Sequence, residues 1–147
     1  MARPEASGVP RLAGQCLCGA VRYAVDDAFE YALNCHCTNC RRATGSAFKA
    51  FAGIARERLA LTQGQGDLLI HGTPQAGDFR CGACGSLLYS VVREAAYAHV
   101  TLGTLTDPPS IRPGAHIFTA SKASWFDITD DLPQFAGHVV VEDHGPG

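Results

Sequence analysis

The chain has 147 residues, of which 46% are hydrophobic and 18% are charged, a balance typical of one soluble globular domain. Its formal net charge of −2 argues against nucleic acid as a partner, and no window approaches the roughly eighteen apolar residues of a membrane span. The N-terminus lacks the pattern of a signal peptide, and unpaired cysteines suit a reducing compartment, so we expect a cytoplasmic protein.

The N-terminal segment predicts a disordered leader over residues 1–13, because it contains two prolines and no apolar periodicity. Residues 15–25 then favour a single strand. Alternate side chains of a strand share a face, so Cys16 and Cys18 would point the same way and reach one metal ion together.

The stretch with the densest chemistry places three thiols in six residues, at Cys35, Cys37 and Cys40, and follows them with two arginines. Three thiolates can hold a zinc ion by three corners of its tetrahedron and leave the fourth for water or a substrate atom. Strict alternation turns His36 away from a metal held by its neighbours, which makes it a poor fourth ligand.

One helical turn is expected after this triplet, capped by Thr38 or Asn39 and ended by Gly45. Arg41 and Arg42 on that turn have three possible roles. They could lower the pKa of the thiols, bind the carboxylates of an anionic thiol, or form a solvated face.

The middle of the chain predicts short strands separated by glycine turns, over residues 29–33, 47–51, 58–61, 68–71, 86–92 and 96–102. Between the fourth and fifth of these, Cys81 and Cys84 have the spacing of a zinc knuckle. Both close cysteine pairs end in Cys-Gly. Gly19 and Gly85 are therefore expected to adopt positive φ and to turn their amides toward the thiolates.

Near the C-terminus, residues 116–118 predict another strand, and a tail is expected over residues 137–147. His116 suits a hydrogen-bonded structural histidine better than a catalytic base. Trp125 is the only tryptophan and lies close to Lys122 in sequence, so it could line a substrate cleft or serve as a core or rim aromatic.

Seven cysteines cannot all pair as disulfides, and their close spacings are those of metal sites. We expect a closed structural zinc site formed by Cys16, Cys18, Cys81 and Cys84, and a second, open zinc site formed by Cys35, Cys37 and Cys40. Two alternatives remain: one structural zinc with the other thiols buried and inert, or a site that mixes Cys16 and Cys18 with Cys35 and Cys37.

Residues 14–23, 35–48, 79–85, 116–118 and 121–126 together resemble the glutathione-dependent formaldehyde-activating enzyme (GFA) family, whose domain is shared with centromere protein V. The resemblance extends over about residues 14 to 135, and a zinc domain is accordingly expected over residues 14–136. It implies the same four-plus-three division of zinc ligands. It also implies a mainly β fold, a β-tent of small antiparallel sheets stapled by two zinc ions.

Zinc deprotonates a bound thiol outright, so an open three-thiolate site could present a small thiol as a thiolate at neutral pH. The resemblance implies glutathione and formaldehyde as the reacting pair, with an S-hydroxymethyl adduct as product and a carbon–sulfur lyase reaction in reverse. Arg41, Arg42 and Trp125 would then contact the substrate.

Two other functions compete with this lyase. A zinc-stapled interaction module without catalysis predicts a fourth protein ligand at the triplet, such as His116 or a residue of a partner. A thiol redox enzyme would require a cysteine that holds no metal.

Overall fold

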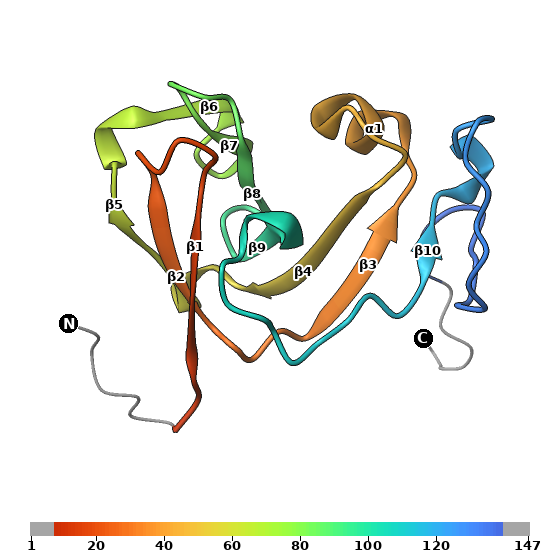
Figure 1. The fold of residues 1–147 in the computed structure, drawn as a ribbon, viewed down its shortest axis with the longest axis horizontal. Helices are drawn as coiled ribbons and strands as arrows, with labels where there is room; N and C mark the ends of the chain where they lie inside the picture. The colour runs from red at the N-terminus through yellow and green to blue at the C-terminus, as the bar shows by residue number, and fades with distance from the viewer. Residues whose placement is uncertain (1–7, 140–147) are drawn as a thin grey trace.

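The computed structural model describes residues 8–139, which form two β-sheets and, within that range, one short α-helix (Figure 1). The three-stranded sheet has the order β1-β2-β5 and contains β1 (Arg11–Gln15), β2 (Arg22–Asp26) and β5 (Leu59–Gln63). The mainly β fold class is confirmed.

The larger sheet has seven strands in the order β10-β3-β4-β9-β8-β7-β6. Its strands are β3 (Tyr31–Cys35), β4 (Lys49–Ala55), β6 (Leu68–Thr73), β7 (Ala76–Cys81), β8 (Leu87–Val92), β9 (Tyr97–Thr101) and β10 (His116–Ile117). Neighbouring strands run antiparallel except β10, which pairs parallel with β3. At this edge a long connection returns the chain alongside β3.

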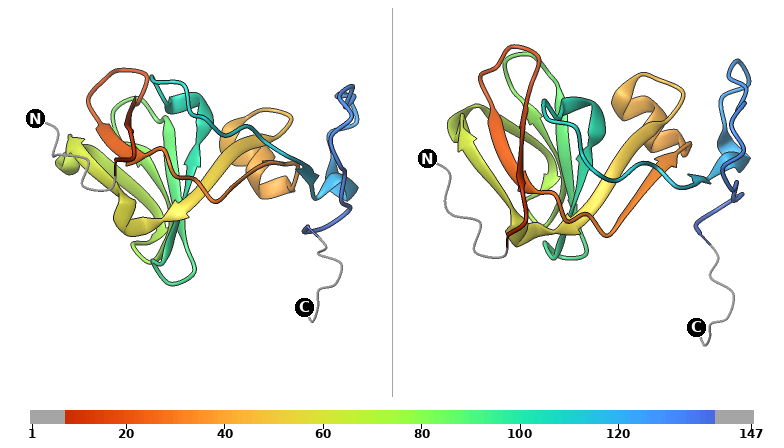
Figure 2. Two further views of the ribbon diagram at one scale, coloured as in Figure 1. Left: turned by 90° about the horizontal axis from the view of Figure 1, so that it is seen from below. Right: turned by 60° about the horizontal axis from the view of Figure 1, so that its bottom comes forward.

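The main hydrophobic core lies between the three-stranded sheet and the β7–β9 part of the larger one. Tyr23 and Val25 of β2 are buried there against Tyr89 and Val91 of β8. A second, smaller cluster surrounds Cys35 and includes Phe51 and Ile117. Figure 2 shows the three-stranded sheet at one end of the molecule and β10 with the C-terminal segment at the other.

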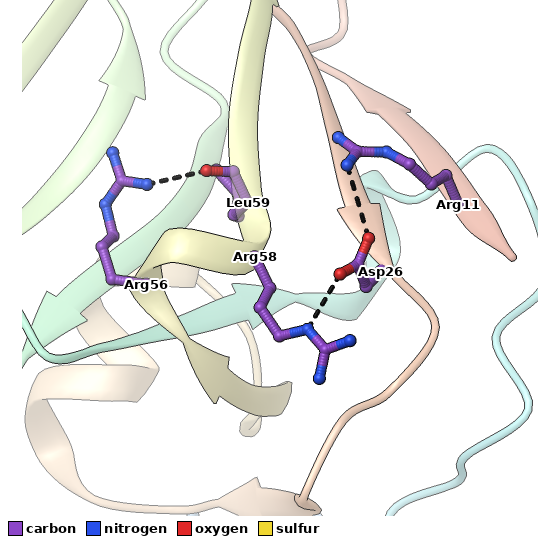
Figure 3. Close-up of polar contacts among 5 residues, drawn as sticks. All are labelled: Arg11, Asp26, Arg56, Arg58 and Leu59. Atoms are coloured by element: carbon purple, nitrogen blue, oxygen red, sulfur yellow. Dashed lines mark hydrogen bonds and ion pairs between the residues drawn. The ribbon is translucent and has the colours of Figure 1, made fainter. Parts of the chain in front are cut away.

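Two ionic contacts stabilise the three-stranded sheet where β2 ends (Figure 3). Asp26 ends β2 and accepts contacts from Arg11 at 3.4 Å and from Arg58 at 2.8 Å. Beside it, Arg56 donates to the carbonyl oxygen of Leu59 at 2.9 Å. Asp26 thereby joins β1, β2 and the turn that leads into β5.

The boundaries of the N-terminal elements differ from the prediction. β1 begins at Arg11, so residues 11–13 of the expected leader belong to a strand, while residues 1–7 lie outside the described residues. The expected strand over residues 15–25 is two strands, because positive φ at Gly19 turns the chain between them. Cys16 and Cys18 therefore lie on a turn and not on a strand.

Two further differences concern the middle and the end of the chain. β7 is absent from the predicted strands, because Gly77, Asp78 and Arg80 interrupt its apolar residues. At the end, Gly137 accepts a hydrogen bond from the amide of Phe118 at 2.8 Å, so the first residues of the expected tail contact the domain. Residues 140–147 of that tail lie outside the described range.

Candidate metal centres

A four-thiolate cluster joins the turn after β1 to the end of β7. The sulfur atoms of Cys16, Cys18, Cys81 and Cys84 all lie within 4.8 Å of one another. The Sγ of Cys18 is 3.7 Å from that of Cys16 and 3.8 Å from that of Cys81. A tetrahedral zinc ion with bonds of about 2.3 Å to sulfur would hold its ligands about 3.8 Å apart. The observed separations fit this geometry.

Backbone amides support the buried sulfurs of this cluster. The amide of Val21 donates to Cys16 Sγ at 3.3 Å, and the amides of Ala83 and Cys84 donate to Cys81 Sγ at 3.4 Å. Hydrogen bonds of this kind stabilise thiolates by opposing their negative charge. The two turns therefore provide partial positive charge at the positions where two ligands would carry negative charge.

The two Cys-Gly glycines adopt the predicted conformation but not the predicted contacts. Gly19 has φ of 81° and Gly85 has φ of 85°. Their amides donate to the carbonyl oxygens of Cys16 and Cys81, and not to sulfur. Their role is to close the turns, and the neighbouring amides contact the thiolates instead.

The second cluster contains three thiols at the junction of β3 and α1 (Thr38–Thr44). Cys35 ends β3 and is buried, Cys37 caps the helix, and Cys40 lies in its first turn. The Sγ of Cys37 accepts a hydrogen bond from the amide of Cys40 at 3.3 Å. A cysteine therefore takes the capping role expected of Thr38 or Asn39. Gly45 ends the helix with φ of 66°, as predicted.

These three sulfurs also lie within 4.8 Å of one another, and no other His, Cys, Asp or Glu atom in residues 8–139 joins the group. A hydrogen bond from Cys40 lowers the pKa of the Cys35 thiol to about 6, and the positive charge of Lys49 acts in the same direction. The same bond raises the pKa of Cys40. Three closely spaced sulfurs suit a thiophilic ion such as zinc.

Lys49 is a neighbour of this cluster, and its position there was not predicted from the sequence. It lies opposite Cys35 in the β3–β4 pair and is buried. Its Nζ donates to Ser90 Oγ at 2.9 Å, and that hydroxyl donates to Asp78 Oδ1 at 2.6 Å. A lysine that begins an otherwise apolar strand, residues 49–55, is the signal in the sequence that could have identified it.

His36 points into a buried histidine pair and not toward the sulfurs, as alternation predicts. Its Nε2 lies 2.8 Å from Nδ1 of His116, and Nε2 of His116 contacts Asp130 Oδ2 at 3.0 Å. Burial and the adjacent His116 lower the pKa of His36 to about 4. His116 has both ring nitrogens engaged and is not a fourth member of the cysteine group. The alternative that makes His116 a metal ligand is wrong for this arrangement.

The three proposed substrate residues lie in different environments. The half-buried Arg41 donates to the carbonyl oxygen of Ser121 at 3.1 Å, so its guanidinium ties α1 to the C-terminal segment. Trp125 is 67% exposed. Arg42 is exposed on the same helix and lines a cavity of about 690 Å³.

That cavity lies between α1 and the β6–β7 hairpin. Its lining residues are Asn39, Arg42, Ala43, Leu69, His71, Asp78 and Arg80. Two guanidinium groups and one carboxylate therefore face the same space, beside the helix that carries Cys40. Arg80 is held in place by its bonds to the carbonyl oxygens of Ala43 at 2.8 Å and Gly85 at 3.1 Å.

A family model described as glutathione-dependent formaldehyde-activating enzyme (GFA) matches residues 11–121. The chain belongs to the GFA family. A crystal structure of a Rhodobacter sphaeroides protein has 27% sequence identity to this GFA chain and a TM-score of 0.56, over 67% of this chain and 92% of that one. Comparison with curated proteins gives no significant match. The resemblance of the cysteine motifs to this family is thus confirmed.

No helix in the described part of this GFA chain is both long and apolar enough to cross a membrane.

Proposed function

We propose that this GFA chain is a zinc-dependent carbon–sulfur lyase-type enzyme that acts on an adduct of a small thiol and an aldehyde. The observation that carries the proposal is the cluster of Cys35, Cys37 and Cys40, which no further ligand atom of the described chain joins. Three protein ligands and one free position are the arrangement of catalytic zinc, whereas four protein ligands are the arrangement of structural zinc. The four-thiolate cluster then serves the fold.

When bound, zinc supplies the charge that converts a thiol to a thiolate at neutral pH. Cys35, Cys37 and Cys40 would hold the ion and orient its open position. In the forward direction the substrate thiol loses its proton and its sulfur attacks the aldehyde carbon. A carbon–sulfur bond forms, the carbon–oxygen double bond becomes a single bond, and the aldehyde oxygen takes up a proton. In the reverse direction the same bond breaks, which releases the aldehyde and the thiol.

The cavity beside α1 supports an anionic thiol such as glutathione as the co-substrate. Arg42 and Arg80 offer two positive charges and Asp78 offers one negative charge. Glutathione carries two carboxylates and one ammonium group, so its charges complement this set. Arginine binds carboxylates through paired N–H donors, which favours Arg42 as a positioning group.

Kinetics with formaldehyde and several thiols test the proposal. We expect the unaltered chain to form the adduct faster than the uncatalysed reaction. In Cys40→Ser the rate should fall to the uncatalysed value, and the zinc content should fall from two ions per chain to one. A rate that never exceeds background with any thiol would reject the enzymatic role. It would leave the zinc-stapled interaction module as the function.

The thiol redox enzyme receives no support from the geometry. All seven cysteines are free, and each belongs to one of the two clusters. No cysteine is left over to act as an independent nucleophile, so the thiols are better explained as metal ligands.

A further inference from the structure

Among residues 8–139, Lys49 is the lysine or arginine side chain buried at the three-thiolate cluster, and the proposed reaction does not use it. Its exposed fraction is 6%. Lysine is rarely buried unless its charge is compensated, because removal of an ammonium group from water is costly. Within residues 8–139 no carboxylate forms an ion pair with it, and its hydrogen-bond acceptor is the neutral hydroxyl of Ser90. The negative groups whose charge acts on Lys49 are Asp78 and the three cysteines of the cluster.

The strand register shows how Lys49 lies relative to the cysteines. Lys49 and Cys35 are directly opposed on β4 and β3. Opposed residues project to the same face of a sheet, with Cβ atoms about 4.5–5.5 Å apart. Phe51, two residues along β4 on that face, packs in the hydrophobic cluster with Cys35, and the Nζ of Lys49 is 5.8 Å from its ring centroid. Lys49 therefore projects to the same face of the sheet as Cys35, and its positive charge acts on that thiol.

Asp78 compensates part of the charge of Lys49, although within residues 8–139 the two groups form no direct ion pair. Asp78 is also joined to Lys49 through Ser90, whose hydroxyl accepts from Nζ and donates to the carboxylate. The serine fixes the position of the ammonium group. Backbone amides donate to sulfur atoms in both clusters, so the buried lysine opposite Cys35 is an addition to that support at the three-thiolate cluster.

The charge of a loaded three-thiolate site depends on its fourth ligand. A divalent ion with three thiolates carries one negative charge, and a neutral fourth ligand leaves that value unchanged. A thiolate as fourth ligand raises it to two negative charges, which a fixed positive charge in an apolar setting stabilises. We propose that Lys49 is a specificity-determining residue that favours an anionic fourth ligand, a thiolate, over a neutral one. The inference rests on the proposed function of the triplet as an open metal site.

The test uses the full chain loaded with Co²⁺, whose visible spectrum reports thiolate and imidazole ligation separately. 2-Mercaptoethanol provides an anionic ligand without carboxylates, and imidazole provides a neutral one. In Lys49→Met the ratio of thiolate affinity to imidazole affinity should fall about tenfold, the effect of one nearby opposite charge. Arg112→Gln, which removes one charge from an exposed position, should leave the ratio unchanged.

Lys49→Gln provides a second neutral variant that can still donate to Ser90, in case Lys49→Met does not fold. Metal content at the four-thiolate cluster and circular dichroism report the fold of both. An unchanged ratio in either folded variant overturns the inference, and so does an equal loss of both ligands, which would indicate a purely structural role. If thiol fails to enter the coordination sphere even in the unaltered protein, both the proposed function and the present inference fail. If thiol binds equally well without Lys49, only the present inference fails.

Discussion

The Sγ atoms of Cys18 and Cys81 lie 3.8 Å apart, although 63 positions separate the two residues in sequence. This contact joins the turn between β1 and β2 to the end of β7, and so connects the small sheet to the large one. Closure of so long a loop has an entropic cost that local propensity cannot offset. A metal ion at this cluster would supply the missing free energy.

Cys81→Ser is therefore expected to abolish cooperative folding. Structural zinc contributes about 10–16 kcal/mol in small domains, which matches or exceeds the 5–15 kcal/mol that a whole domain retains. Thermal unfolding followed by circular dichroism, with zinc content per chain, measures the effect. Cys40→Ser is the matched control, because it removes a thiol from the other cluster and should leave the unfolding transition in place. A Cys81→Ser protein that melts like the unaltered chain would disprove a structural role for this cluster.

Arg42→Gln should weaken the use of glutathione without affecting thiols that lack carboxylates. Arg42 is an exposed residue at the rim of the cavity, so the loss should be about 1 kcal/mol, or a fivefold increase in KM. Steady-state kinetics with glutathione and with 2-mercaptoethanol measure both effects. Arg112→Gln controls for net charge. Equal changes with the two thiols would show that Arg42 does not recognise the carboxylates.

The stability of the domain should fall as the pH decreases from about 6.5 to 4, in part because of His99. Burial, with the positive charges of Lys49 and Arg93, lowers the pKa of His99 to about 4. Below pH 6.5 the unfolded chain binds a proton that the folded chain does not, so acid favours unfolding until the folded pKa is reached. For this partly solvent-accessible ring we expect a loss of about 2 kcal/mol.

Denaturant unfolding at several pH values tests this expectation. His99→Gln keeps a polar partner for the Tyr31 hydroxyl, which lies 2.8 Å from His99 Nε2, but does not titrate. The difference in the free energy of unfolding between this variant and the unaltered chain measures the contribution of His99 titration, because any acid-induced metal loss is common to both. A difference that is constant from pH 7 to pH 4 would contradict the prediction.

Gly53→Ala should destabilise the domain by about 2 kcal/mol, the usual cost of overpacking. Tyr31 lies directly across from Gly53, and a Cβ at this glycine would lie 2.2 Å from Cζ of the tyrosine ring. The ring would have to leave its position and lose its hydrogen bond to His99.

A double-mutant cycle with Tyr31→Ala checks this explanation. Without the ring, Gly53→Ala should cost less than about 0.5 kcal/mol by denaturant unfolding. A cost that does not depend on Tyr31 would locate the strain elsewhere.

The spacing of the cysteines indicated metal sites and favoured a division into clusters of four and three, and the resemblance of several motifs to the GFA family implied the mainly β fold. Metal ligands close in sequence need only a turn to converge, so their pattern is local and can be recognised without a structure. Gly45 was predictable for the same reason, since a helix end depends on a few neighbouring residues.

Tertiary structure alone determined the surroundings of the three-thiolate cluster. The position of Lys49 opposite Cys35 depends on strand register. The His36–His116 contact joins residues 80 positions apart, and the cavity at Arg42 forms where α1 meets a hairpin from later in the chain. Such pairings arise when distant segments bury their apolar faces together, and no short stretch of sequence contains that information.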